Sequence, residues 1–443
     1  MTMNSFERKI TPAFILKFTL PTMIMMVFNS FYTMVDGGFV SNFVGTAALS
    51  AINIVYPVIS LVFSVGIMLA TGGSAVVAKQ MGEGNEGQAK KSFSLITLLG
   101  VSIGALFMLV GTCFTKPIVM ALGANEAIYS FCYDYTFFIS LFVPFAVLQV
   151  LFQFFFATSG RPDLGLISTV IGGVSNIVLD YVFMVPLNMG IKGAAIATGI
   201  GFVIPSVIGI MYFTGKSNRI LHFVKPVFDG STVLKTCTNG SSEMVSNLSV
   251  AITTFMFNII MMRYLGEDGV AAMTIVFYAQ FLFTAVFMGY TSGVAPLISF
   301  NYGAQNKNRL KQLFKISMIF IAFCSALAFI LSILLAKSVV GVFAPPGSNV
   351  FDLAIQGMGL FAIGFLFMGF NIFASGMFTA LSNGKVSAIL SFLRTFVFIV
   401  IAISVLPVLF EIDGIWVSVP IAEFLAILVS AWYMVKLKKV YEY

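Results

Sequence analysis

The sequence predicts an all-α integral membrane protein with about twelve transmembrane helices in two six-helix lobes. Three observations predict this fold class. Of the 443 residues, 59% are hydrophobic and only 9% are charged, whereas soluble proteins carry about 25% charged residues. Apolar stretches long enough to cross a bilayer follow one another along nearly the whole chain. The two halves of the chain also share one sequence pattern.

The apolar stretches define the order of the expected helices, since each has the roughly 17–25 residues that a transmembrane helix needs. They cover 13–39, 47–72, 92–115, 130–156, 164–187 and 191–213, and then 236–262, 269–300, 311–336, 352–378, 386–409 and 414–436. The first stretch is too long for the core of a signal peptide, so we expect a retained helix. We expect an N-terminal lobe over 1–213, a cytoplasmic linker over 214–235 and a C-terminal lobe over 236–443.

The net charge of +7 reflects the expected topology. Lys and Arg gather at alternate ends of the expected helices, and the opposite ends hold only Lys116, Lys192, Arg263 and Lys337. The positive-inside rule therefore places both termini in the cytoplasm, in a multi-pass protein of the inner (plasma) membrane. Because the charges are spread over short loops rather than gathered in one patch, no nucleic-acid partner is expected.

The cysteines and the single histidine point to no metalloenzyme. Cys113, Cys132, Cys237 and Cys324 lie far apart without metal-binding spacing, as small apolar residues in helices do. His222 lies in the linker with no Cys or carboxylate arrangement around it. We expect no catalytic residues and no cofactor.

A shift of 221 residues superposes the two halves. It places Gly82 on Gly303 and, late in each half, Gly193 on Gly414. Each half has six spans, so both halves start on the same side of the membrane. They form a parallel repeat, related by a pseudo-two-fold axis along the membrane normal. Two rigid halves on a flexible linker are what rocker-switch motion needs.

Ionisable side chains within membrane spans cost about 2.5–3.5 kcal/mol and indicate function. In the first half, Asp36 and Asp180 each precede an outer loop by a few residues. Asn176 lies one turn before Asp180, and Thr198 lies at a similar depth on the returning helix. Two carboxylates, an amide oxygen and a hydroxyl suit a hard cation such as Na⁺, or a shared proton. The structural alternative is an interhelical hydrogen-bond cluster with no bound ion.

The repeat provides an internal control for this set. The 221-residue shift places apolar residues at the four positions, namely Phe257, Val397, Ile401 and Val419. Both halves have similar packing demands, so polar residues at these positions in one half alone favour a functional role over a structural one.

The second half carries charges of its own. Arg394 and Glu423 are expected to pair as a structural salt bridge, because buried charges are generally paired. Glu243 lies near a helix entrance, where it is either hydrated or an accessory functional group. In the first helix, Pro21 permits a bend on the helix that carries Asp36. Neutralisation of Asp36 would change that bend, and a static kink is the alternative.

The sequence resembles the multidrug and toxin extrusion (MATE) family over essentially the whole chain. The resemblance is carried by LPTMIMMVFNSFYTMVDGGFVSNFVGTAALSA (residues 20–51), ATGGSAVVAKQMGEGN (70–85), SNIVLDYVFM (175–184) and MGIKGAAIAT (189–198). It implies two six-helix lobes and export driven by inward Na⁺ or H⁺. It also implies a cation site at Asp36, Asn176, Asp180 and Thr198, with Tyr135 lining the same lobe and with bending at Pro21.

Other branches of the family use carboxylates in the seventh and tenth helices. Glu243 matches the first of these, but the tenth-helix stretch here has no carboxylate, which favours the first lobe.

The expected function is secondary antiport by a monomer in the lipid bilayer. Small, often cationic and lipophilic compounds such as antibiotics would leave through a cavity lined by Phe, Met and Tyr. A lipid-linked oligosaccharide flippase of the same superfamily is the alternative, but it needs a strongly cationic cavity, and only Arg394 is available in midmembrane. A membrane-embedded enzyme needs a clustered nucleophile or a His/Asp pair, and a channel fits poorly with two non-identical halves.

Overall fold

The computed structural model describes residues 5–126, 128–215 and 220–443, and all regular structure within these residues is helical. The first half contains η1 (Ser5–Glu7), α1 (Pro12–Phe43), α2 (Thr46–Gly82), α3 (Glu86–Cys113), α4 (Thr115–Ala121), α5 (Tyr129–Ser140), α6 (Val143–Thr158), α7 (Pro162–Met184) and α8 (Gly190–Thr214). The second half contains α9 (Gly230–Gly303), α10 (Lys307–Leu334), α11 (Ala336–Phe343), α12 (Asn349–Phe361), η2 (Ala362–Gly364), α13 (Phe365–Ala380), α14 (Gly384–Phe392), the π-helical turn η3 (Leu393–Val397) and α15 (Phe398–Tyr441).

The helices confirm the predicted number of spans. Within the described residues, nine helical stretches are long and apolar enough to cross a membrane, and the pair α5–α6, bent by 57°, makes a tenth. Two of the nine stretches each contain two spans, because the helix is interrupted by non-helical backbone at Gly266 in α9 and at Glu411 in α15. Together with the bent pair, the described residues therefore form twelve spans.

The repeat extends to helix starts and turns. Asn85 and Asn306 occupy equivalent positions, and each side chain caps the helix that follows, α3 and α10 respectively. Gly45 and Gly266, also equivalent, both have positive φ. Glu411 has a φ of 50° where the first half has Gly190 at 59°, so a side chain occupies a backbone conformation that glycine adopts far more readily.

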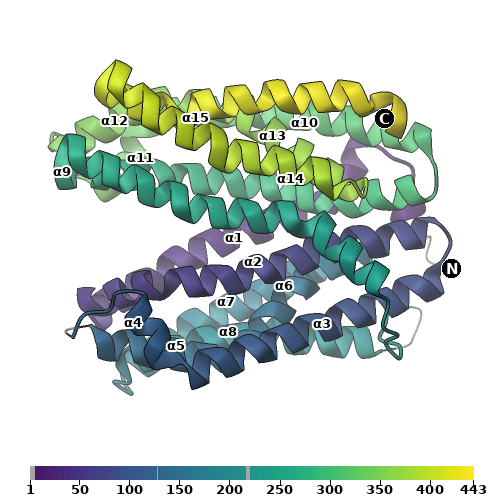
Figure 1. The fold of residues 1–443 in the computed structure, drawn as a ribbon, viewed down its shortest axis with the longest axis horizontal. Coiled ribbons are helices and arrows are strands. Elements are labelled where there is room, and N and C mark those ends of the chain that lie inside the picture. The colour runs from purple at the N-terminus through teal and green to yellow at the C-terminus, as the bar shows by residue number, and fades with distance from the viewer. Residues whose placement is uncertain (1–4, 127, 216–219) are drawn as a thin grey trace.

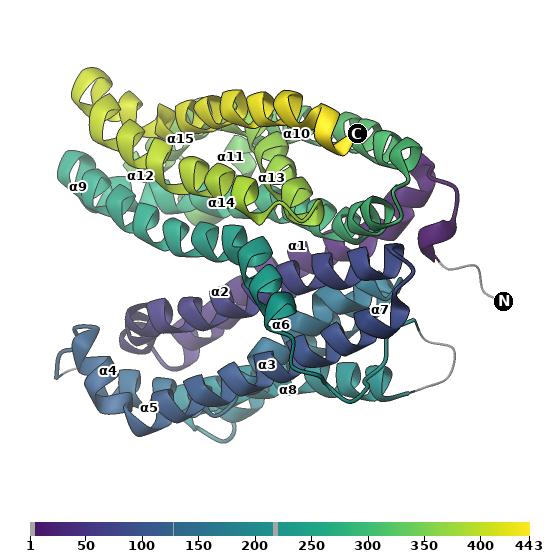
Figure 2. The same ribbon diagram turned by 45° about the vertical axis from the view of Figure 1, so that its right-hand side comes forward.

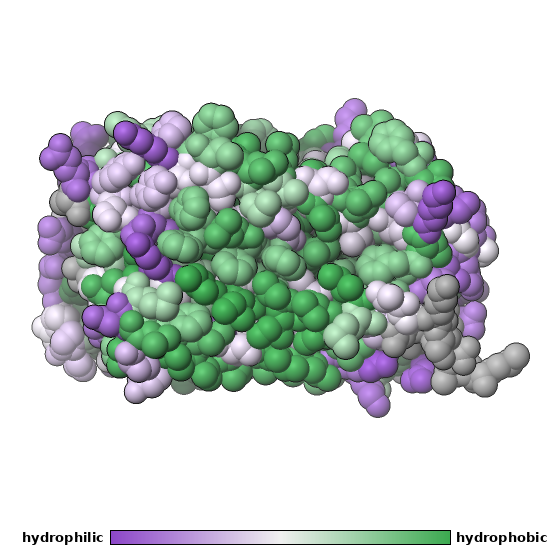
Figure 3. Space-filling model, turned by 90° about the horizontal axis from the view of Figure 1, so that it is seen from below, coloured by the Kyte–Doolittle hydropathy of each residue, from purple (hydrophilic) through white to green (hydrophobic). Residues whose placement is uncertain are grey.

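The two halves form two lobes (Figures 1 and 2), with the first half in purple to teal and the second in teal to yellow. Their helices lie close together at the end that carries both termini and diverge toward the opposite end. The most extensive contact between the lobes joins α2 and α9. Side chains on the face shown in Figure 3 are hydrophobic over the middle and hydrophilic toward both ends, as a bilayer requires.

Glycines close the molecule at the end with the termini. A Cβ atom at Gly82 would overlap the carbonyl oxygen of Phe300, and one at Gly303 would overlap that of Lys79. Lys79 and Phe300 are themselves 221 residues apart. One contact is therefore made twice about the pseudo-two-fold axis, with main-chain atoms of α2 and α9 touching directly. We call these two contacts the glycine seal.

Part of the linker expected over 214–235 packs on the first lobe. Residues 216–219 lie outside the described residues, but the ring of Phe223 stacks on Phe93 at 5.0 Å, and the Val224 N–H donates to Ser94 Oγ over 3.0 Å. Helix α9 begins at Gly230, before the expected span start at 236. Where it is described, the linker packs on the first lobe, because its apolar residues find a partner surface on α3.

Candidate functional site

Helix α7 positions the first-lobe site by packing closely against both α1 and α8. A Cβ at Gly173 would overlap the ring of Phe28 and lie 3.6 Å from Cγ of Tyr32, both on α1. On the α8 side, a Cβ at Gly172 would lie 2.7 Å from the carbonyl oxygen of Gly201. Two consecutive glycines on α7 therefore let three helices approach at the level of the predicted polar side chains.

The structure brings the predicted first-lobe residues together. The carboxyl groups of Asp36 on α1 and Asp180 on α7 lie within interaction range of each other. Tyr135 on α5 interacts with both carboxyls and with the hydroxyl of Thr198 on α8. Asn176 lies one turn before Asp180 and packs against Gly201. A Cβ atom added at Gly201 would lie 3.1 Å from the Cβ atom of Asn176. Four helices contribute to this cluster.

Most polar atoms of the cluster are buried without a hydrogen-bond partner. Asp180 is 0% exposed and Asn176 is 1% exposed; apart from the approach of the Asp36 carboxyl group to that of Asp180, neither side chain has a hydrogen-bond partner for its terminal atoms. One oxygen of Asp36 is buried in the same way. Thr198 Oγ1 donates to the Ala194 carbonyl over 3.0 Å and interacts with Tyr135. Unpaired buried polar groups are costly, so this arrangement fits a small bound cation or proton.

The ligand types support a hard cation rather than a transition metal. Carboxylate, amide and hydroxyl oxygens are the donors that hard cations prefer. In the parts of the chain that the structure describes, no three His, Cys, Asp or Glu side chains gather as a metal site. The site offers two carboxylates together with neutral oxygens, which suits a hard cation.

Tyr32 is a site residue that the sequence reasoning missed. It lies on α1 one turn before Asp36 and interacts with both Asp36 and Asp180. The available signal was its four-residue spacing from Asp36, which places the two side chains on one helix face. Pro21 lies in the same helix, and α1 continues through it without a break.

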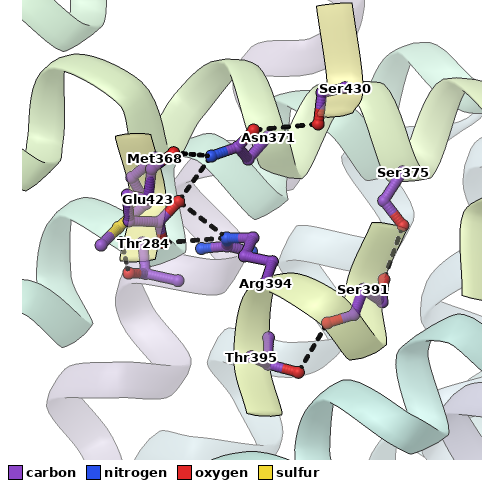
Figure 4. Close-up of polar contacts among 9 residues, drawn as sticks. All are labelled: Thr284, Met368, Asn371, Ser375, Ser391, Arg394, Thr395, Glu423 and Ser430. Atoms are coloured by element: carbon purple, nitrogen blue, oxygen red, sulfur yellow. Dashed lines mark hydrogen bonds and ion pairs between the residues drawn. The ribbon is translucent and has the colours of Figure 1, made fainter. Parts of the chain in front are cut away.

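The second-lobe charges form a different kind of site (Figure 4). Arg394 Nε donates to Glu423 over 2.8 and 3.0 Å, which confirms the predicted ion pair. Asn371 Nδ2 donates to Glu423 Oε2 over 2.7 Å, and Ser430 Oγ donates to Asn371 Oδ1 over 3.0 Å. The side chain of Glu423 is 4% exposed. Its carboxylate is fully partnered, unlike that of Asp180.

Glu243 and a set of hydroxyls lie near this ion pair. Glu243, on α9, is close enough to Arg394 for the two charges to attract. Buried hydroxyls join α9, α13 and α14, with oxygen–oxygen distances of 2.7–3.3 Å along a series formed by Ser242, Thr379, Ser387, Ser375 and Ser391. The sequence reasoning missed these hydroxyls and Asn371, because neutral polar residues in apolar helices give little signal.

The family of the chain follows from a match that covers most of both lobes. The MatE family profile matches residues 21–182 and 244–404. The chain belongs to the MATE family. Members of this family are membrane transporters, so the chain is a multi-pass membrane transporter and not an enzyme. The two matched segments fall one in each lobe.

Similar curated proteins are multidrug export proteins of staphylococci. The chain is 25% identical over 419 residues to the multidrug export protein MepA of Staphylococcus saprophyticus, covering 93% of this chain and 89% of that protein. It is 24% identical over 432 residues to MepA of Staphylococcus aureus, covering 96% and 94%. These identities extend over almost the full length of each protein.

Solved MATE structures share the fold. A crystal structure of MATE in complex with MaL6 superposes with a TM-score of 0.92 at 21% identity, covering 99% of this chain and 100% of that one. An outward-facing multidrug resistance MATE transporter gives 0.90 at 22% identity, covering 99% of each chain. A MOP superfamily transporter from Pyrococcus furiosus, described as having a binding pocket of reverse polarity, gives 0.90 at 21% identity, covering 99% and 98%.

Proposed function

We propose that this MATE transporter exports small, often cationic and lipophilic organic compounds in exchange for inward Na⁺ or H⁺. Its relatives are multidrug export proteins. The observation that carries the coupling proposal is the cluster of Asp36, Asn176 and Asp180, whose buried polar atoms lack protein partners. A cation or proton supplies what these atoms lack. The positive-inside rule supports a cytoplasmic position for both termini, in which case the lobes diverge toward the outside.

Coupling follows from the position of the site on α1. Asp36, Asn176, Asp180 and Thr198 supply the oxygens that hold the coupling ion. Helix α1 contacts α7 within its own lobe and α9 of the other lobe. A change in charge at Asp36 therefore acts on α1, a helix that also lies at the interface between the lobes. Bending at Pro21 would transmit that change, and rocker-switch motion of the lobes would then carry the substrate across.

The flippase alternative receives no support from the second lobe. A pyrophosphate-bearing substrate needs free cationic groups in the cavity. Arg394, the Arg available in midmembrane, is bound to Glu423 and lies near a second carboxylate, Glu243. Arg394 is therefore not free to bind a pyrophosphate group.

Replacement of the site carboxylates tests the proposal. Asp36→Asn and Asp180→Asn each remove a charge while keeping the side-chain shape. In proteoliposomes with an imposed Na⁺ or H⁺ gradient, each change is expected to abolish export of a fluorescent cationic dye. Imposing one gradient at a time identifies the ion.

Asp163→Asn is the matched control. Asp163 lies at the start of α7, the helix that carries Asp180, but it is half-exposed and paired with Arg161 over 2.7 Å. It is expected to leave export unchanged. Gradient-driven export that survives both Asp36→Asn and Asp180→Asn would show that this cluster does not couple the ion.

A further inference from the structure

The N-terminal segment 5–8 crosses from the first lobe to the second at the end that carries the termini. Phe6 is 0% exposed, and its ring stacks on Phe300 at 5.1 Å with the ring planes 26° apart. It also meets the edge of Phe18, on α1, at 6.1 Å. Phe300 belongs to the second lobe, and its carbonyl oxygen lies in the glycine seal. One apolar side chain is thus buried between both lobes.

Polar contacts hold the same segment. The guanidinium of Arg309, on α10, donates to the carbonyl of Arg8, and the carboxylate of Glu7 attracts the same guanidinium. Nearby, the ammonium of Lys79 lies 5.1 Å from the ring centroid of Tyr302, a cation–π distance. Each of these contacts joins residues of the first half to residues of the second.

The repeat shows that the fold does not require this docking. The 221-residue shift places Val227 at the position of Phe6, and Val227 is 53% exposed. The residue after it, Phe228, is 82% exposed. An aromatic side chain thus precedes the first helix of each half, but only the first-half segment is buried against the opposite lobe. The fold that the two halves share therefore does not need this contact, which points to a role in function.

We propose that residues 5–8 form a latch, held by Phe6 and Arg8, that keeps the lobes together at the end with the termini. This proposal rests on the alternating access of the proposed function. When the lobes part at this end, either Phe6 leaves Phe300 and Arg8 leaves Arg309, or Phe6 leaves Phe18. The latch therefore biases the resting transporter toward the state that is closed on this side, and its release is a step of every transport cycle.

A distance measurement between the lobes tests the latch. Spin labels at Lys91→Cys and Gln312→Cys occupy exposed, repeat-related positions on α3 and α10. They are introduced after replacement of the native cysteines Cys113, Cys132, Cys237 and Cys324. Double electron–electron resonance then reports the fraction of molecules in which this end is open, in nanodiscs with and without a gradient.

Phe6→Ala is expected to raise the ratio of open to closed molecules at least about fivefold, since it removes contacts made only in the closed state. Arg309→Gln is expected to shift the ratio in the same direction and keeps the latch testable if Phe6→Ala folds poorly. Phe6→Leu retains a buried apolar side chain, so its ratio of open to closed molecules is expected to stay near that of the unaltered protein. Phe228→Ala, which replaces the exposed phenylalanine, is expected to change nothing.

The outcomes separate the latch from the transport proposal. If the unaltered protein alternates between two distances while Phe6→Ala and Arg309→Gln match Phe228→Ala, the latch is wrong and alternating access stands. If the unaltered protein keeps one distance under every gradient, alternating access is wrong and the latch is wrong with it. A shift in both latch variants with none in Phe228→Ala supports both.

Discussion

At the scale of residues, the carboxylates of the two lobes differ in how their oxygens are satisfied. Glu423 accepts hydrogen bonds from Arg394 and Asn371, whereas no N–H or O–H donor reaches the buried oxygens of Asp180, whose neighbour is the carboxyl group of Asp36. A fully partnered buried charge contributes to structure, and an unpartnered one is available to a ligand. The two buried carboxylates thus differ in their neighbours, and we expect them to differ in role.

The ion pair of Arg394 and Glu423 is expected to matter for stability. Glu423→Gln or Arg394→Met alone leaves a buried charge unpaired and is expected to destabilise the protein by about 3–5 kcal/mol. The double change to Met and Leu removes both charges and is expected to recover most of that loss. Thermal unfolding in detergent, followed by size-exclusion fluorescence, measures the effect.

The exposed pair of Arg161 and Asp163 is the control for this prediction. Its side chains are 50% and 47% exposed, so Asp163→Asn is expected to change stability by no more than about 1 kcal/mol. If the double change at Arg394 and Glu423 were as destabilising as either single change, the pair would be doing more than neutralising a buried charge.

The residues of the first-lobe site were predictable where they carried charge. Asp36 and Asp180 stood out because a charge within a membrane span is costly, and Asn176 followed from its spacing to Asp180. Tyr32 and Asn371 did not stand out, because a tyrosine or an amide in an apolar helix has many ordinary roles. Their partners lie on other helices, and only the packing of those helices identifies them.

At the scale of elements, α1 links the candidate site to the rest of the molecule. It runs without a break from Pro12 to Phe43, carries Asp36 in its second half and meets α9 of the other lobe. Pro21 lies in its first half, on the side nearer the latch. A proline within a helix removes one backbone hydrogen bond and makes local bending easier.

Pro21→Ala is expected to stiffen α1 and slow transport. The new amide can donate within the helix, so the straight conformation gains stability while the Asp36 site is untouched. Dye export in proteoliposomes is expected to fall by about tenfold if bending limits the cycle. Pro57→Ala, in the interior of α2, is the control for loss of a proline in itself, and equal export by both variants would argue against a special role for Pro21.

The number of spans and two helix breaks were predictable from the sequence. The breaks at Gly266 in α9 and at Glu411 in α15 fall in the gaps 263–268 and 410–413 between expected spans. The bend between α5 and α6 was not predictable. The stretch 130–156 is continuously apolar, yet α5 and α6 meet at a 57° bend. Hydropathy reports burial in lipid and contains no information on such bends.

At the scale of the whole molecule, the lobes touch through main-chain atoms at the glycine seal. Gly82→Ala and Gly303→Ala each insert a methyl group where a carbonyl oxygen of the other lobe lies. Because the two contacts are equivalent in the repeat, both variants are expected to open this end to a similar extent. The spin-label pair at Lys91→Cys and Gln312→Cys measures the opening.

Gly87→Ala is the matched control for the seal. Gly87 lies in the first turn of α3, and a Cβ there would meet nothing within 4 Å. It is expected to leave the distance unchanged. A closed distance retained in both Gly82→Ala and Gly303→Ala would mean that the lobes adjust to the extra methyl groups, and that the seal is less tight than its geometry indicates.

The glycine seal also bears on how far the two halves of such a transporter can diverge. Each contact of the seal needs a peptide carbonyl from one lobe, which every residue provides. From the other lobe it needs a glycine, because there is no room for a side chain. Lys79 and Phe300 occupy equivalent places there although their side chains share no chemistry. Variation at these carbonyl positions therefore leaves the closure intact, so each half is free to acquire its own ion or drug chemistry while the gate between them stays the same.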